Sequence, residues 1–417
     1  MRSHMIAFGV GGGLALVAAG ALALIAPKFA ERHDGGDGFH IVNITDGGRG
    51  SFHLKDDALD VSAEWKGDFS FAADGRSLTA LTERLEVASK DQNGERKAVF
   101  ENRKGAIVAR AFKGDRETPA GADADREAGD LLQLFARSSG VNADSRVKAM
   151  LTAGGKARVI EEIGALVGGH AVGAYVEALA AEAALDDADV RVLAARVKGL
   201  TSDYAKRSAL GALLTTQELS EASIAAIIDV AKTIEGDHEL RLIVEQLAEK
   251  KISERNFAIA SRLIDEIEGD HEVRLAVSAL LESENLDDAD AARALKAAAA
   301  KIDGDHELRL ALESADERLQ DGEVGGAGLA VIAAIEGDHE RRLAIEDFAD
   351  SLEGESPHWI GLAEAAKGVS SDHERRLAVE AIYGAAPQSS DIRAALRQVA
   401  ETIGSDHERR LALEALD

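Results

Sequence analysis

The sequence predicts a mainly α-helical protein, in which an N-terminal transmembrane helix and a small antiparallel β domain precede an α-solenoid of about eight 34-residue helical pairs. Three observations predict this fold. Residues 5–26 carry no charge, alternating apolar and polar residues follow, and a histidine or tyrosine then recurs every 33 to 35 residues. The predicted segments are an anchor at 1–27, a flexible tether at 28–38, the β domain at 39–115, linker and transition helices at 116–160, and the solenoid at 161–417.

The uncharged N-terminal stretch is 22 residues long. At a rise of about 1.5 Å per residue, a helix of this length crosses the roughly 30 Å hydrocarbon core of a bilayer. A cleavable signal peptide is the alternative, since Ala21-Leu22-Ala23 offers a small-x-small cleavage site, although signal h-regions usually run only about 7–15 residues. Gly9 and Gly13 have the spacing at which two membrane helices approach closely. We therefore expect membrane attachment through this helix.

Alternation with a period of two predicts the β domain. The predicted strands are 39–44, 59–65, 69–71, 85–87, 98–100 and 107–112. Asn93-Gly94 and Asp74-Gly75 are typical hairpin turns. Pro119 and the polar segment after it end this pattern, and apolar residues at 131, 132, 134 and 135 then recur at helical spacing.

The 34-residue repeat is marked by His170, Tyr204, His238, His271, His306, His339, His373 and His407. Ser or Gly and then Asp precede six of these histidines, and Glu follows each of the six. This pattern predicts a capping box at the start of a helix, which we call helix A, with the Glu reaching back to the N-cap. A second start, at Asp186, Ser220, Ser253 and Asp287, predicts helix B. The first copy, at Gly168-Gly169-His170, lacks the Asp and the Arg and looks like a cap.

An arginine follows the histidine or tyrosine at the third position and lies four residues after the Asp. That spacing places Asp and Arg on one helix face, and the pair can also reach into the next repeat, so we expect an Asp–Arg ladder that fixes the register of the repeats. We expect the histidine to fill a structural position at the start of helix A that tyrosine also fills, since Tyr204 stands at the same point of its repeat. The predicted ladder comprises Asp203, Tyr204, Arg207, Asp237, His238, Arg241, Asp270, His271, Arg274, Asp305, His306, Arg309, Asp338, His339, Arg342, Asp372, His373, Arg376, Asp406, His407 and Arg410.

These repeats resemble tandem Ser-Asp-Tyr/His-Glu-x-Arg helical repeats of bacterial membrane-anchored envelope proteins, and they are similar to the non-catalytic repeat region of some BlaR-type sensor metallopeptidases. The best match is Thr201-Ser202-Asp203-Tyr204-Ala205-Lys206-Arg207. The resemblance implies a bacterial envelope setting, with the chain in the inner membrane and its soluble part in the periplasm. It does not imply peptidase activity, because the peptidase membrane domain is missing and histidine replaces the usual tyrosine in most copies.

No motif predicts a catalytic residue, a cofactor or a metal. A zinc protease needs His-Glu-x-x-His, but Leu242 stands where His238-Glu239 would require the second histidine. The chain has no cysteine, and Asp123-x-Asp125-x-Glu127 lacks the glycine of a calcium loop. The Gly325-Gly326-Ala327-Gly328 run lacks the Lys-Ser/Thr of a phosphate loop and is expected to be an ordinary loop.

The net charge of −27 makes nucleic acid an unfavourable partner, because the chain would repel phosphates. We expect a non-enzymatic, membrane-anchored scaffold that offers an extended acidic surface to a protein partner, with self-association through the β domain or the membrane helix as a further interaction. One alternative is an envelope sensor or regulator that responds to pH or ligand through the His/Asp/Arg ladder. Another is an enzyme of unrecognised class.

Overall fold

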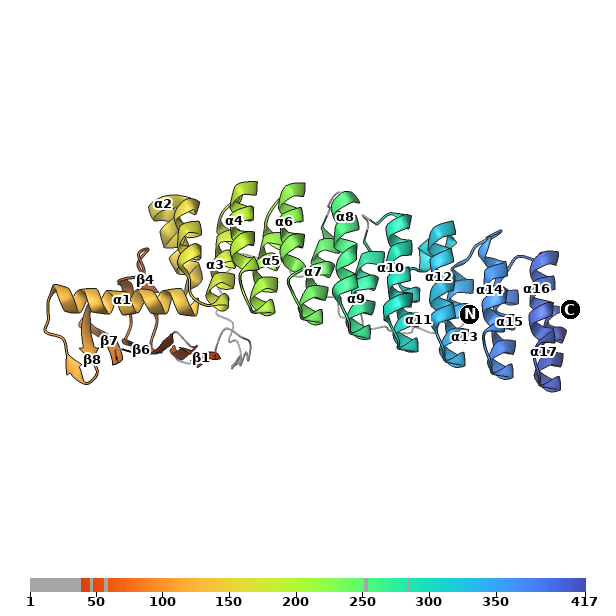
Figure 1. The fold of residues 1–417 in the computed structure, drawn as a ribbon, viewed down its shortest axis with the longest axis horizontal. Helices are drawn as coiled ribbons and strands as arrows, with labels where there is room; N and C mark the ends of the chain where they lie inside the picture. Colours follow the sequence, from red (N-terminus) through yellow and green to blue (C-terminus); the bar gives the residue numbers. More distant parts are fainter. Residues whose placement is uncertain (1–38, 46–47, 56–58, 93, 251–253, 284–285) are drawn as a thin grey trace, which may run out of the picture.

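The protein is mainly helical, with a small antiparallel β region before a long helical array (Figure 1). The predicted membrane span and tether lie outside the residues that the structure describes. Within the described part, no helix combines the length and apolarity needed to cross a bilayer. The computed structural model describes residues 39–45, 48–55, 59–92, 94–250, 254–283 and 286–417.

The β region is a seven-stranded antiparallel sheet with strand order β1-β2-β3-β6-β7-β8-β9, and β4 and β5 form a separate hairpin between β3 and β6. The predicted turn at Asp74-Gly75 joins β4 to β5, whereas Asn93 of the other predicted turn lies outside the described residues. Strands β2, β5 and β9 were not predicted. The strands are β1 (Phe39–Thr45), β2 (Arg49–Lys55), β3 (Asp60–Lys66), β4 (Phe69–Phe71), β5 (Leu78–Leu81), β6 (Arg84–Asp91), β7 (Gly94–Arg103), β8 (Ala106–Lys113) and β9 (Arg116–Glu117).

Helix α1 (Ala122–Ser139) packs across one face of this sheet (Figure 1). Its Phe135 lies at the centre of an aromatic cluster, with ring centroids 5.6 to 6.2 Å from those of Phe52, Trp65, Phe69 and Phe71. The sheet therefore buries its apolar face under a helix from the segment that the sequence assigned to the transition between domains.

Antiparallel helical pairs form the array, and consecutive pairs stack side by side (Figure 1). Helix α2 (Ala143–Ala165) precedes and packs on the first pair. The A helices are α3 (Gly169–Glu182), α5 (Asp203–Thr216), α7 (Asp237–Glu249), α9 (Asp270–Leu281), α11 (Asp305–Glu313), α13 (Asp338–Ser351), α15 (Asp372–Ala385) and α17 (Asp406–Leu416). The B helices are α4 (Asp187–Lys198), α6 (Glu221–Ala231), α8 (Glu254–Ala260), α10 (Asp288–Lys301), α12 (Gly322–Ala334), α14 (His358–Lys367) and α16 (Ser390–Glu401).

The predicted helix starts agree closely with the structure. Seven A helices begin at the predicted Asp, directly after a Gly or Ser N-cap. Asp186, Ser220 and Asp287 are N-caps of B helices whose side chains accept backbone hydrogen bonds, whereas Ser253 lies outside the described residues. Short polar caps and the apolar stripe behind them therefore account for where these helices start.

The glycine run at 325–328 lies inside helix α12, so the expectation of a loop was wrong. A Cβ atom at Gly325 would lie 2.3 Å from Nε2 of His358 in α14, and one at Gly328 would lie 2.8 Å from the Leu319 side chain. The glycines let α12 approach its neighbours closely, and this packing outweighs the low helix propensity of glycine.

Candidate functional site

The ladder Asp caps the next A helix of the array. Asp338 accepts hydrogen bonds from the backbone N–H groups of Ser370 (2.6 Å) and Ser371 (2.7 Å), which stand directly before α15. Asp203, Asp237, Asp270, Asp305 and Asp372 make the equivalent contacts one repeat further on, at 2.7 to 2.8 Å from the N-cap nitrogen. The N-terminal N–H groups of one helix are thus satisfied by the preceding repeat.

The ladder Arg also reaches the following repeat. Its Nε donates a hydrogen bond, at 2.5 to 2.9 Å, to the Glu that directly follows the ladder histidine of the next repeat. The pairs are Arg207–Glu239, Arg241–Glu272, Arg274–Glu307, Arg309–Glu340, Arg342–Glu374 and Arg376–Glu408. Six consecutive junctions therefore carry the same ion pair.

These partners define the first expectation more closely and correct the second. Asp and Arg both contact the next repeat, one of the two arrangements that their spacing allowed, but the Asp takes backbone amides and the Arg takes a Glu. The Glu does not complete a capping box, because its carboxylate faces the Arg of the preceding repeat. Its expected acceptor role at the N-cap amide is filled by the preceding Asp.

The ladder histidines lie on the surface. The side chains of His238, His271, His306, His339 and His373 are 58 to 66% exposed. The histidine position is therefore not part of the hydrophobic core. Each Nδ1 lies 3.5 to 3.7 Å from the Glu of the next repeat. In the repeat that has tyrosine, the Arg207 guanidinium lies 4.8 Å from the centre of the Tyr204 ring. His and Tyr therefore share one property at this position, because each places an aromatic ring beside the ladder Arg.

The ladder contacts favour ionised carboxylates. Hydrogen bonds from the N–H groups of Gly404 and Ser405 lower the pKa of Asp372 below its ordinary value. The hydrogen bond from Arg309 lowers the pKa of Glu340, and that from Arg376 lowers the pKa of Glu408. Both kinds of contact stabilise the charged form of the acid.

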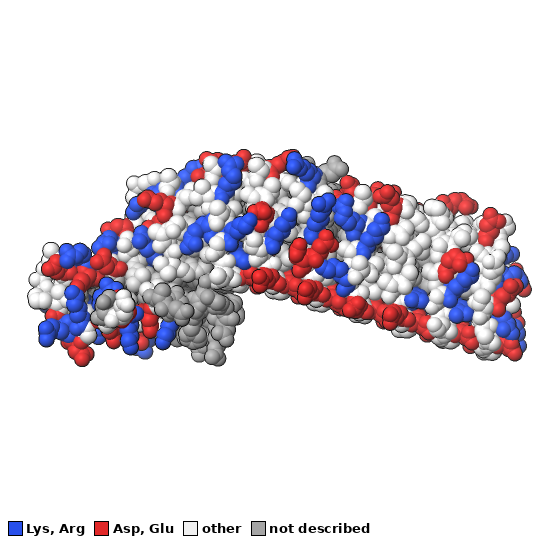
Figure 2. Space-filling view, viewed as in Figure 1, with Lys and Arg blue, Asp and Glu red and all other residues white. Residues whose placement is uncertain are grey.

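Acidic side chains dominate one edge of the array. Figure 2 shows a nearly continuous row of Asp and Glu along the lower edge, where the B-to-A turns and the starts of the A helices lie in Figure 1. Besides the ladder acids, an exposed acid precedes the glycine N-cap in four turns, at Glu235, Glu268, Asp303 and Glu336. Residues 169–417 contain 51 Asp and Glu against 26 Lys and Arg, so nearly all of the net charge of −27 belongs to the array.

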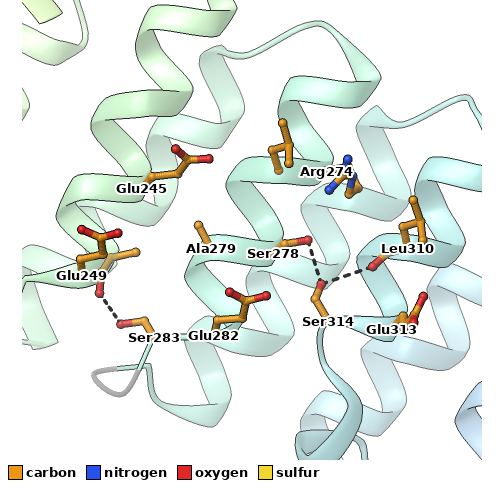
Figure 3. A pocket seen from close by; sticks show the side chains of 12 residues that line it. Glu245, Glu249, Arg274, Ser278, Ala279, Glu282, Ser283, Leu310, Glu313 and Ser314 are labelled. Atoms are coloured by element: carbon orange, nitrogen blue, oxygen red, sulfur yellow. Dashed lines mark hydrogen bonds between the residues drawn. The ribbon is translucent and has the colours of Figure 1, made fainter. Parts of the chain in front are cut away.

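A hollow of about 1090 Å³ lies on the A-helix face, across α7, α9 and α11 (Figure 3). Four carboxylates line it, at Glu245, Glu249, Glu282 and Glu313, together with the single arginine Arg274. A smaller hollow of about 210 Å³ shares Glu313 and continues the acidic lining to Asp347 and Asp350. The sequence patterns described above did not predict this surface. A usable signal existed, because Glu follows the ladder Arg by four residues at 245, 313, 346, 380 and 414.

No family model matches the sequence, and neither the curated proteins nor the solved structures contain a match. The similarity to BlaR-type repeat regions therefore stays a prediction. Within the described ranges, no group of three or more His, Asp or Glu side chains is arranged to hold a metal ion.

Proposed function

We propose that the chain is a non-enzymatic scaffold of the bacterial envelope that binds a basic segment of a partner protein along its acidic helical array. In this proposal residues 5–26 anchor the chain in the inner membrane, and the array is an α-solenoid of about eight 34-residue repeats facing the periplasm. The β region is the part available for self-association. Repeat arrays of this kind commonly use their extended surfaces for protein binding.

The distribution of charge carries the proposal. The ladder arginines are 11 to 23% exposed at Arg207, Arg241, Arg274, Arg309, Arg342 and Arg376, and each is already paired with a Glu of the next repeat. Many acids are exposed and form no such ion pair with another described residue, including Glu249, Glu282 and Asp350 on the A-helix face. A field of one sign along such a face attracts and orients a partner of the opposite charge.

The test measures binding of an eight-residue peptide of alternating Lys and Ala to the full chain by fluorescence anisotropy, near physiological salt. We expect binding that weakens with added salt, and no binding of an alternating Glu and Ala peptide. Neutralising A-helix acids in a Glu249→Gln, Glu282→Gln, Asp350→Asn variant should weaken binding by about tenfold, or about 1.4 kcal/mol.

The matched control neutralises three exposed acids on B helices in a Glu221→Gln, Glu323→Gln, Glu401→Gln variant. It changes net charge by the same amount and should alter affinity less than twofold. Absence of Lys peptide binding, or equal losses in the two triple variants, would contradict the proposed A-helix binding surface.

A second candidate function is a pH-responsive regulator, favoured by the five His–Glu contacts between consecutive repeats. Protonation of each imidazole would add an attractive charge pair at 3.5 to 3.7 Å between neighbouring repeats and change their packing. Replacing the six histidines that precede Glu with Tyr, the residue that position 204 already carries, should abolish a change in small-angle scattering between pH 7.5 and 5.5. A change that persists in this variant would exclude the ladder as its source.

A further inference from the structure

The repeat pattern is interrupted at Arg274. In four other repeats the ladder Arg donates through Nη1 to a Glu four residues later in its own helix, at Glu245, Glu313, Glu346 and Glu380. Position 278 is Ser instead, and its hydroxyl lies 3.0 Å from that of Ser314 in α11. The side chain that would fill this place on the A-helix face is therefore missing.

Among the described ladder arginines, Arg207 offers the nearest comparison. Arg207 also lacks the Glu, because position 211 is Gly, but the Gln246 side chain of α7 lies there, 2.8 Å from where a Cβ of Gly211 would stand. Beside Arg274 none of the described residues takes the place of the missing Glu, and the hollow of about 1090 Å³ lies there (Figure 3).

Arg274 presents an unused donor edge to this hollow. Its Nε donates to Glu307 at 2.9 Å and its Nη2 lies 3.3 Å from Nδ1 of His271. None of the described residues accepts a hydrogen bond from its Nη1. Leu275 and Leu310 contribute apolar lining, while Ser278 and Ser314 contribute hydroxyl groups.

We infer that this hollow binds an extended, Lys- or Arg-containing segment of the partner, with a main-chain carbonyl on Arg274 and basic side chains on the surrounding glutamates. The inference rests on the proposed function and locates its principal contact. A carbonyl fits Arg274 better than a free carboxylate does, because four glutamates around a single arginine repel an anion. Alternate side chains of an extended segment point the same way, so every second basic residue can face the acidic wall.

The size of the hollow sets the length of the segment. Packed helices lie roughly 8–10 Å apart, so three A helices span roughly 16–20 Å. An extended chain covers that distance with about five or six residues at about 3.3 Å each. The eight-residue Lys and Ala peptide is therefore long enough to test the site.

Ser278→Glu is the decisive variant. It introduces the glutamate that the repeats of Arg241, Arg309, Arg342 and Arg376 carry at this place, so its carboxylate should pair with Arg274 and occupy the hollow. We expect binding of the Lys and Ala peptide to weaken by about tenfold, the loss that corresponds to one hydrogen bond from a charged group. If the overall negative charge alone attracted the peptide, the variant would bind it more tightly, because the variant carries one more negative charge.

Ser390→Glu is the matched control, because it adds the same charge at an exposed position of helix α16. It should bind the peptide as tightly as the wild type or slightly more tightly. Ala279→Gln fills the hollow without a charge and should also weaken binding, so the inference remains testable if Ser278→Glu misfolds by circular dichroism.

The outcomes separate the two proposals. If the wild type binds the peptide and neither filling variant weakens binding, the site is wrong while the acidic scaffold stands. If the wild type does not bind the peptide, the proposed function falls and the site falls with it.

Discussion

At the scale of single residues, the main result is that each repeat from Asp203 to Asp372 caps the next. The sequence shows Asp and Arg recurring four residues apart, and this spacing suits a pair within one helix as well as contacts to the following copy. The sequence alone cannot distinguish these two arrangements, because the spacing within a repeat and the spacing between repeats recur with the same regularity. In the structure the Asp contacts the following repeat. The backbone N–H groups before the A helix need acceptors, and the Asp of the preceding repeat lies within reach.

Asp338→Ala tests this capping. The variant leaves the N–H groups of Ser370 and Ser371 without their carboxylate, so we expect a loss of about 1–2 kcal/mol in the free energy of unfolding, in the range measured for lost helix caps. Urea denaturation followed by circular dichroism measures it. Asp406→Ala is the control, because that side chain is 93% exposed and contacts only Arg409 of its own helix among the described residues. Equal losses in the two variants would refute capping between repeats.

At the scale of elements, helix α2 joins the β region to the array. Gly155 has φ 69° and ψ −173° and bends the helix, so that Arg146 in its first half meets Glu162 in its second half at 2.6 Å. Arg137 of α1 donates to the same carboxylate, and Arg146 donates to the hydroxyl of Tyr175 in α3. Burial alone would raise the pKa of Glu162, but the two arginines outweigh it and lower that pKa. One buried carboxylate thus connects α1, α2 and, through Arg146, α3.

We therefore expect Glu162→Gln to lower the free energy of unfolding strongly. It leaves the fully buried Arg146 without its counter-ion, and removing one partner of a buried pair costs about 3–5 kcal/mol. We expect faster hydrogen exchange in α1, α2 and α3 and a lower urea midpoint. The neighbouring Glu161→Gln serves as the control, because its side chain is 74% exposed and its ion pair with Arg158 contributes at most about 1 kcal/mol. Unchanged exchange in Glu162→Gln would show that the charge cluster does not hold this junction.

The elements also show how far sequence patterns reach. Helix starts were predictable, because caps and first-turn acids are local signals. Strand β2 was missed because its sequence, RGSFHLK, contains only Phe52 and Leu54 as buried large apolar residues. The role of α1 was missed because periodicity shows that a helix has an apolar face but not which surface covers it. The hollow beside Arg274 was missed because it depends on which side chains of neighbouring helices leave space.

At the scale of the whole molecule, the surplus negative charge lowers the stability of the folded array, whereas the paired charges of the ladder raise it. Repulsion among surplus acids destabilises the array, but physiological salt screens it beyond about 8 Å. The ladder pairs act at hydrogen-bond distance and are screened less. Because every repeat contacts mainly its neighbours, the contributions of the junctions add along the array.

Acid should therefore destabilise the protein. The pKa values of Glu340, Glu408 and Asp372 are lower in the folded chain than their ordinary values of 4.5, 4.5 and 3.8. The unfolded chain thus takes up protons first as pH falls, so the stabilisation is complete above pH 4.5 and is lost progressively below it. Urea midpoints at pH 7 and pH 3.5 measure the effect, and a midpoint that is equal or higher at pH 3.5 would contradict it.

Capping by the preceding Asp gives the array a direction. Each repeat carries the acceptor for its successor, so a helix pair can complete its start only after the pair on its N-terminal side is in place. Loss of a C-terminal pair leaves every remaining helix start intact, whereas loss of an N-terminal pair exposes the start of the next helix. The contacts therefore favour growth of the folded array from its N-terminal side, the same order in which a ribosome releases the chain.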